Sequence, residues 1–228
     1  MATVKITYMF VFSDGRTHEH EVVLDSDTGR QISGPLLSKQ SWAALEHQKC
    51  KHCTLKKEEQ PECPAAKNLA VVADAFKSEK SFEKVLIEVV TAERIYRKEL
   101  PLQEGLFGLF GLIMATSDCP TLDFLRPMAR FHLPFSTLQE TTIRSVSFYL
   151  LRQYFVAKRG GTPDYDLVDL QKRYDALEEV NRRMADRIRS ISKDDAEANS
   201  IVILDTFAQL LSNQLTHKLP GLDKLFSS

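Results

Sequence analysis

Residues 4–23 read VKITYMFVFSDGRTHEHEVV, and large apolar side chains recur at every second position of the first half. One face of this stretch therefore collects Val4, Ile6, Tyr8, Phe10 and Phe12. A period of two is typical of a β-strand with one buried face. The turn-forming residues SDGR follow at 13–16, and Glu19, Glu21 and Val23 continue the alternation, so we expect a β-hairpin.

Outward from the hairpin, β-branched residues cluster again at 82–90 and 94–100, which predicts a second strand pair. Between the two pairs we expect a short helix near 42–47 and a longer one from Pro64 to about Phe76.

From residue 102 onward the apolar spacing becomes helical. The expected helices span 102–116, 120–130, 136–158, 165–191 and 195–217. Pro127 should kink or end the second of these, because proline removes a helical hydrogen bond. The short connection at 192–195 predicts that the last two helices form an antiparallel hairpin.

These patterns predict an α+β fold, in which an N-terminal β-hairpin and small antiparallel sheet pack on a mostly helical C-terminal bundle. We expect one domain over residues 1–228, with a sheet-containing, cysteine-rich half at 1–101 and a helical half at 102–228. The glycines at 105, 108 and 111 lie on an otherwise apolar helix, which favours a buried core helix that another backbone approaches closely.

The charge balance disfavours nucleic acid as a partner, since 30 basic and 31 acidic residues leave a formal net charge of -1. The longest apolar run, 105–115, is far shorter than the roughly 20 residues of a membrane-spanning helix, so we expect no membrane contact. No secretory signal is visible at the N-terminus, and we expect a cytoplasmic protein. In such a reducing compartment cysteines favour metal binding or redox chemistry over disulfides.

The chain has four cysteines, Cys50, Cys53, Cys63 and Cys119. The first two have the C-x2-C spacing that lets two thiolates bind one ion, and the polar residues before Cys63 give that loop little hydrophobic reason to be ordered. We therefore predict a four-cysteine metal site, with structural zinc as the leading hypothesis. An iron–sulfur cluster is the alternative, because it also takes four thiolates.

Pro64 and Pro120 suit the first position of a helix. Cys63 and Cys119 would then be N-cap residues, where the helix dipole favours the thiolate. Three other interpretations stay open: thiol–disulfide chemistry at Cys50 and Cys53, cysteines that merely pack in the core, and His47, His52 or His132 as fourth ligand in place of Cys119.

A second candidate site lies in residues 117–135, where Arg126 and Arg130 are one helical turn apart and His132 follows. Two guanidinium groups in this arrangement could bind a carboxylate or phosphate. The plainer interpretation pairs Asp123 with Arg126 and lets His132 cap the carbonyls of the preceding helix.

Asn181 interrupts the apolar seam of the helix expected at 165–191. A buried asparagine costs stability and fixes register, so it could mark a homodimer through the C-terminal helical hairpin or packing within one bundle. The neighbouring Arg182, Arg183, Arg187 and Arg189 are interpreted as a solvated, mixed-charge face.

Two pairs of segments carry a resemblance to a known family: CKHCTL with CPAAKNLA, at 50–55 and 63–70, and SDCPTLDFLRPMARFHLPF with ETTIRSVSFYLLRQYF, at 117–135 and 140–155. In their order these motifs resemble an uncharacterised bacterial protein family, a domain of unknown function. The resemblance covers nearly the whole chain and implies a bacterial, cytoplasmic protein of one domain.

The function predicted from the sequence is a binding or regulatory module of unknown ligand, built around the metal site at Cys50, Cys53, Cys63 and Cys119. The alternative is an iron–sulfur or thiol-based redox enzyme or sensor, with a pocket around Arg126, Arg130 and His132.

Overall fold

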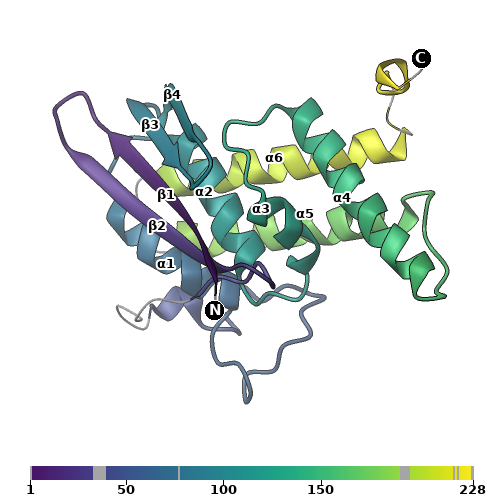
Figure 1. The fold of residues 1–228 in the computed structure, drawn as a ribbon. Coiled ribbons are helices and arrows are strands. Elements are labelled where there is room, and N and C mark those ends of the chain that lie inside the picture. The colour runs from purple at the N-terminus through teal and green to yellow at the C-terminus, as the bar shows by residue number, and fades with distance from the viewer. Residues whose placement is uncertain are drawn as a thin grey trace.

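The computed structural model describes residues 2–32, 40–76, 78–190, 196–217, 219 and 221–226. It confirms the α+β class: a four-stranded antiparallel sheet lies at one side of the molecule and the helices form the remainder (Figure 1). The expected connection at 192–195 lies outside the described residues.

The sheet consists of β1 (Thr3–Val11), β2 (Thr17–Asp25), β3 (Lys84–Val90) and β4 (Ile95–Pro101), in the order β2-β1-β3-β4. All neighbouring strands pair antiparallel, and β1 opposes β3 with Tyr8 beside Val89. Both predicted strand pairs are therefore confirmed, and β1 and β3 join them at the centre.

One face of the sheet is buried, as the period-two pattern predicts. Side chains from the three strands β1, β2 and β3 form this face: Ile6, Tyr8, Phe10, Val22, Leu24, Val85, Ile87 and Val89. The helices α1 (Pro64–Phe76) and α2 (Leu102–Thr116) pack against one another, and their buried residues belong to the same hydrophobic core as the sheet. This single core includes residues of both the sheet-containing and the helical half.

α2 is the central helix of the fold, since it contacts β3 and β4 and also packs against α6. Gly105 and Gly108 let it lie close to the sheet. A Cβ atom at Gly105 would overlap the side chain of Ile87, and one at Gly108 would come within 2.9 Å of the Tyr8 hydroxyl. The expectation of a buried core helix is confirmed, but the atoms closest to Gly105 and Gly108 belong to side chains of the sheet and not to another backbone.

The helical half continues with α3 (Arg126–Arg130), α4 (Leu138–Lys158), α5 (Val168–Arg189) and α6 (Ala196–Thr216). α4 begins with a capping box, in which Thr137 and Glu140 satisfy each other's backbone N–H groups. α5 and α6 pack along one another behind α2 in the view of Figure 1. The short 3-10 helices are η1 (Ser41–Ala43), η2 (Asp123–Leu125) and η3 (Asp223–Leu225).

Two local predictions were wrong. The short helix near 42–47 is the single 3-10 turn η1 followed by turns. The helix expected at 120–130 is interrupted, because Pro120 lies in a turn, η2 follows it, and α3 starts only at Arg126. Pro127 occupies the first turn of α3, where its missing N–H costs nothing, so it starts a helix rather than ending one.

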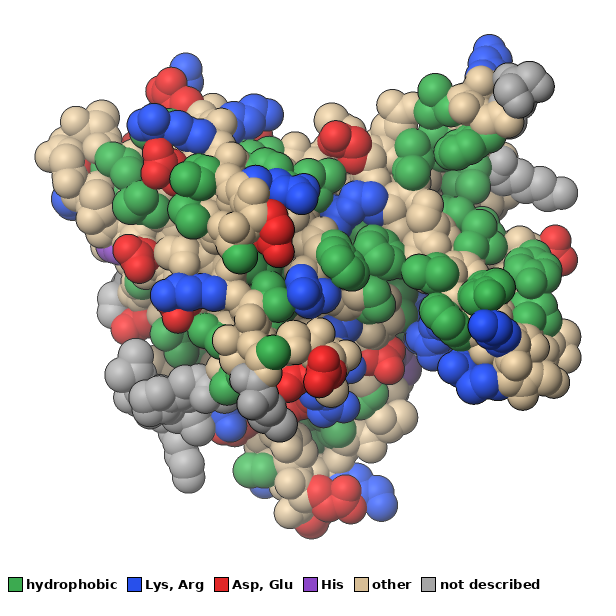
Figure 2. All heavy atoms as spheres, in the orientation of Figure 1, with side chains coloured by type: hydrophobic (Ala, Val, Ile, Leu, Met, Phe, Trp, Pro, Cys, Tyr) green, Lys and Arg blue, Asp and Glu red, His purple; other side chains and the backbone are tan. Residues whose placement is uncertain are grey.

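α4 is unusual because its buried positions are mostly polar and its exposed ones include large apolar side chains. Thr142, Ser145, Tyr149 and Gln153 are buried, whereas Leu150, Leu151, Tyr154 and Phe155 are exposed. Figure 2 shows hydrophobic side chains gathered over this part of the surface. Among the described residues, no helix combines the length and the apolar character needed to cross a membrane.

Candidate metal centre and neighbouring cavity

The four cysteines come from three separate segments that the fold brings to one end of α1 and α2. Cys50 and Cys53 lie in a tight turn closed by the Cys53 N–H, which donates to the Cys50 carbonyl at 3.1 Å. Cys63 directly precedes α1, and its carbonyl accepts the first helical hydrogen bond, from Lys67. Cys119 follows the end of α2.

All four cysteines line the same small cavity, together with one face of α5. The cavity holds about 20 Å³, which is room for roughly one water-sized body. Cys119, 56 positions beyond Cys63, therefore does return to the other three cysteines. The thiols are all free, and in the described part of the chain no group of three or more His, Cys, Asp or Glu side chains is arranged closely enough to hold an ion.

The pKa values of the thiols differ from the sequence prediction. Burial raises the pKa of Cys50 to about 12, and the neighbouring cysteines add to this because their charges would repel. Burial also raises the pKa of Cys119 to about 11, although the backbone N–H groups of Thr121 and Leu122 donate to it and act in the opposite direction. The expectation that position makes Cys119 a helix-capping thiolate was wrong, since no helix begins at Pro120.

Cys63 does lie where an N-cap residue should, because α1 starts at Pro64 as predicted. The difference between Cys63 and Cys119 has a local cause. Residues 64–76 continue as an amphipathic helix with eight buried residues, whereas the Cys119 carbonyl accepts from Leu122 and closes a turn before η2.

Arg187 is the main residue of this site that the sequence did not reveal. It is 2% exposed and lies on the wall of the cysteine cavity. Its guanidinium group donates to the carbonyls of Trp42 at 2.6 Å, Ala44 at 2.8 Å and Leu45 at 3.1 Å. Burial lowers the pKa of Arg187, and Cys63, Cys50 and Cys53 act in the opposite direction. The prediction of a solvated arginine face was wrong for this residue.

No carboxylate within the described residues forms an ion pair with Arg187. Two further cations, Lys49 and Arg183, also line the cysteine cavity. Arg183 is bound to Glu179 and Lys49 to Glu46, so these two already have acidic partners. Arg182, Arg183 and Arg189 fit the predicted mixed-charge face, because they pair with Glu179 and Asp186. A sequence signal for Arg187 exists, since it lies three residues after the buried Met184 on the apolar seam of α5.

None of the three histidines considered as a fourth ligand is among the residues that line the cysteine cavity. His47 hydrogen-bonds to the Ser190 hydroxyl at 3.0 Å, and His52 is exposed. The His132 Nε2 atom hydrogen-bonds to the hydroxyl of Tyr8 on β1 at 2.6 Å, so His132 does not cap the helix before it. Burial lowers the pKa of His132 to about 3, with a further contribution from Arg144, and the ring is neutral.

The structure does not bring Arg126, Arg130 and His132 into one pocket. Arg126 packs on Gly29 and donates to the Ser117 carbonyl at 3.3 Å. This hydrogen bond supports the loop that contains Cys119. Arg130 lies over the ring of Phe131. Asp123 forms its ion pair with Arg173 at 3.6 Å.

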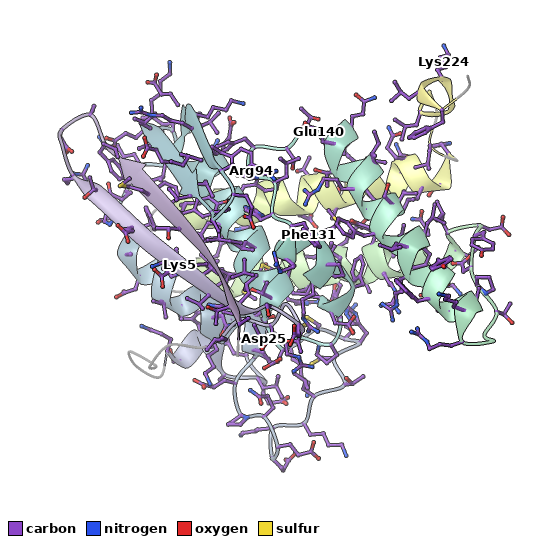
Figure 3. The ribbon with its side chains drawn as sticks, in the orientation of Figure 1. Lys5, Asp25, Arg94, Phe131, Glu140 and Lys224 are labelled. Atoms are coloured by element: carbon purple, nitrogen blue, oxygen red, sulfur yellow. The ribbon has the colours of Figure 1, made fainter. Side chains whose placement is uncertain are left out.

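His132 instead lines a larger cavity of about 160 Å³ between α2, α5 and α6. The connection from α3 to α4 forms another wall of this cavity, and it runs between Phe131 and Glu140, both labelled in Figure 3. Most of the lining is apolar, and the polar exceptions include Asn181 and Arg144.

The fold and the site define an α+β protein with a cavity lined by four thiols. The loop that contains Cys50 and Cys53, helix α1 and the helical half meet at this cavity. The comparison with protein families agrees with the resemblance seen in the sequence: residues 6–227 match the domain of unknown function DUF6901, and the chain belongs to this family. No curated protein and no solved structure matches the chain.

Proposed function

We propose that Cys50, Cys53, Cys63 and Cys119 bind one Zn²⁺ ion as a structural site in a binding or regulatory module, which we expect to be bacterial and cytoplasmic. The observation that carries this proposal is the buried guanidinium of Arg187 beside the thiols. A buried charge without a counterion is costly, and Arg187 has carbonyl partners but no carboxylate among the described residues. Four thiolates on one Zn²⁺ carry a net charge of -2, which supplies the missing counterion.

The backbone around the cysteines supports the same assignment. The N–H groups of Thr121 and Leu122 donate toward Cys119, and such donors stabilise a thiolate bound to metal.

The size of the cavity favours a single ion over an iron–sulfur cluster. A volume of about 20 Å³ accepts one small body, whereas a four-iron cluster with its sulfides needs several times more space.

The test is elemental analysis and an absorption spectrum on protein purified anaerobically. We expect about one zinc per chain and no visible colour, because Zn²⁺ has a filled d shell. A brown protein with broad visible absorbance would instead establish an iron–sulfur cluster. Protein without any metal, which also fails to take up added Zn²⁺, would refute the proposal.

Substitutions provide the matched comparison. Cys50→Ser combined with Cys63→Ser should abolish zinc binding and lower thermal stability, whereas His52→Ala in the same loop should retain both. His52 is the suitable control because it is exposed and lies between Cys50 and Cys53. Full zinc content in the double cysteine variant would show that the ion binds elsewhere.

A further inference from the structure

The larger cavity has the dimensions of a small-molecule site. Its volume of about 160 Å³ is close to that of the roughly 150 Å³ cavity known to hold benzene in another protein. The walls come from α2, the connection between α3 and α4, α5 and α6. The apolar side chains at the wall include Phe107, Leu112, Met114, Leu125, Leu133 and Leu211.

A cation lies at one wall of this apolar space. Arg144 lines the cavity and uses its Nη2 atom to donate to the carbonyls of Met128 at 3.0 Å and Phe131 at 2.6 Å. Burial lowers the pKa of Arg144, and no ion pair involves it in the part of the chain that the structure describes. Its guanidinium group has five N–H donors, so donors remain for another partner.

Two hydroxyl groups accompany the cation. Thr141 lies three residues before Arg144 on the same face of α4, and its Oγ1 atom hydrogen-bonds to the Ser136 hydroxyl at 3.0 Å. Thr141, Ser136 and Arg144 all line the cavity. They give one end of an otherwise apolar space the donors that a carboxylate requires.

Asn181 supplies an independent observation. Its side chain is 2% exposed and lines the cavity from α5. The Asn181 amide has both donors and an acceptor, so a polar atom of a bound ligand can hydrogen-bond to this wall of the cavity.

We infer that this cavity binds a small apolar carboxylic acid, with the carboxylate on Arg144 and the hydrocarbon part among the side chains of α2, α5 and α6. Burial and the nearby charge of Arg144 lower the pKa of the neighbouring His132 and keep its ring neutral, so Arg144 provides the positive charge of the site. This inference goes beyond the proposed zinc centre and does not depend on it.

The experiment is isothermal titration calorimetry on the full chain with four probes: octanoate, 1-octanol, octylammonium and acetate. Octanoate should bind more tightly than each of the others, because 1-octanol lacks the charge, octylammonium has the opposite charge and acetate lacks the apolar part. Equal affinity for octanoate and 1-octanol would overturn the assigned role of Arg144. Absence of octanoate binding would overturn the site itself.

Variants of α4 locate the carboxylate. Arg144→Gln should weaken octanoate binding at least about tenfold and leave 1-octanol binding unchanged. Arg152→Gln, an exposed arginine on the same helix, is the matched control and should bind octanoate as the natural chain does. If Arg144→Gln does not fold, Arg144→Lys takes its place, and it should keep the preference for octanoate over octylammonium. Equal weakening by the two glutamine variants would contradict the proposal.

Asn181→Leu separates a ligand-binding role from a structural one. Leucine has a similar volume and no polar group, so this variant should be more stable without ligand and should bind octanoate more weakly. A less stable variant with unchanged octanoate binding would show that Asn181 serves the fold alone, and it would contradict the use of Asn181 as support for the site. Zinc content should be the same in all of these variants, which distinguishes this outcome from failure of the metal centre.

Discussion

Two arginines, the buried Arg187 and the partly buried Arg144, have the surroundings that indicate most about what this protein binds. Each binds backbone carbonyls, and neither forms an ion pair within the described residues. Because a buried cation needs negative charge nearby, each one indicates a group that the protein takes up. Arg187 faces the thiols and Arg144 lines the apolar cavity.

Replacing Arg187 tests its role as counterion to the metal centre. Arg187→Met should lower the free energy of unfolding by about 2 kcal/mol or more, since the carbonyls of Trp42, Ala44 and Leu45 lose their donor. Arg187→Lys should also lose stability but retain higher zinc affinity than Arg187→Met, because it keeps the charge. Competition with a chromophoric chelator measures this affinity, and equal zinc affinity of the two variants would contradict the counterion role.

The lowered pKa of His132 predicts how the free energy of unfolding depends on pH. Burial lowers its pKa from 6.5 to about 3 in the folded protein. Between these two pH values the histidine is therefore protonated in the unfolded chain and neutral in the folded chain. Stability should therefore fall as pH drops from 6.5 toward 3, by up to about 1.4 kcal/mol per pH unit from this residue. Tyr8 and Arg144 are the ionisable groups that act on the ring.

Urea unfolding at several pH values measures this contribution, with His132→Gln as the comparison. The variant keeps a polar group near Tyr8 but cannot titrate, so its stability should decline less steeply below pH 6.5. Parallel pH profiles of the two proteins would exclude His132 as a source of acid sensitivity.

At the scale of elements, the segment between η1 and α1 has few backbone constraints of its own. An isolated bridge pairs Ala44 with Glu62, and the Leu45 N–H donates to the Pro61 carbonyl at 2.8 Å. Between these points the segment has no helix or strand. Its attachment to α5 and to Cys119 occurs at the cysteine cavity.

Removing the metal should therefore expose this segment to protease. We expect trypsin to cleave after Lys51, Lys56 or Lys57 much faster in the presence of a zinc chelator, because these exposed lysines lie in the part that the ion would anchor. Cys53→Ser should show the fast cleavage without chelator. Mass spectrometry of the early fragments identifies the sites, and unchanged cleavage in both samples would argue against the anchoring.

The contact of α2 with the sheet gives a second prediction at this scale. Gly105→Ala should destabilise the protein by about 1–2 kcal/mol, because the new methyl group overlaps Ile87 and approaches Phe10, and this exceeds the helix propensity that alanine adds. Ile87→Val removes the atom that is overlapped, so the double variant should lose less than the sum of the two single changes. Thermal or urea unfolding measures this cycle, and strict additivity would contradict the close contact.

At the scale of the whole molecule, the thiol cavity and the apolar cavity share two walls. One shared wall is the segment after α2, where residues 119–121 line the thiol cavity and Leu122 and Leu125 line the apolar cavity. The other shared wall is α5, because neighbouring turns of this helix line the two cavities. The apolar seam of α5, including Asn181, packs inside one chain, so packing within the bundle accounts for it. The homodimer through the C-terminal hairpin stays a prediction and would need the outward side of that hairpin.

Leu210 on α6 is an exposed apolar residue that such a dimer could cover. Leu210→Glu should convert a dimer into a monomer in light-scattering measurements, because a charge at an apolar contact is costly. Leu151→Glu on α4 is the matched control and should leave the dimer intact. Dissociation by the second variant alone would place the interface on α4 instead.

Sequence patterns alone predict both strand pairs, the α+β class, the starts of α1 and α2 and the approximate extent of α4, α5 and α6. These features depend on local spacing and turn chemistry, which are readable along the chain. The return of Cys119 to Cys63, the burial of Arg187 and the partner of His132 were decided by the tertiary structure. They depend on how α2 and α5 pack across the core, and no local pattern records which distant residues this packing brings together.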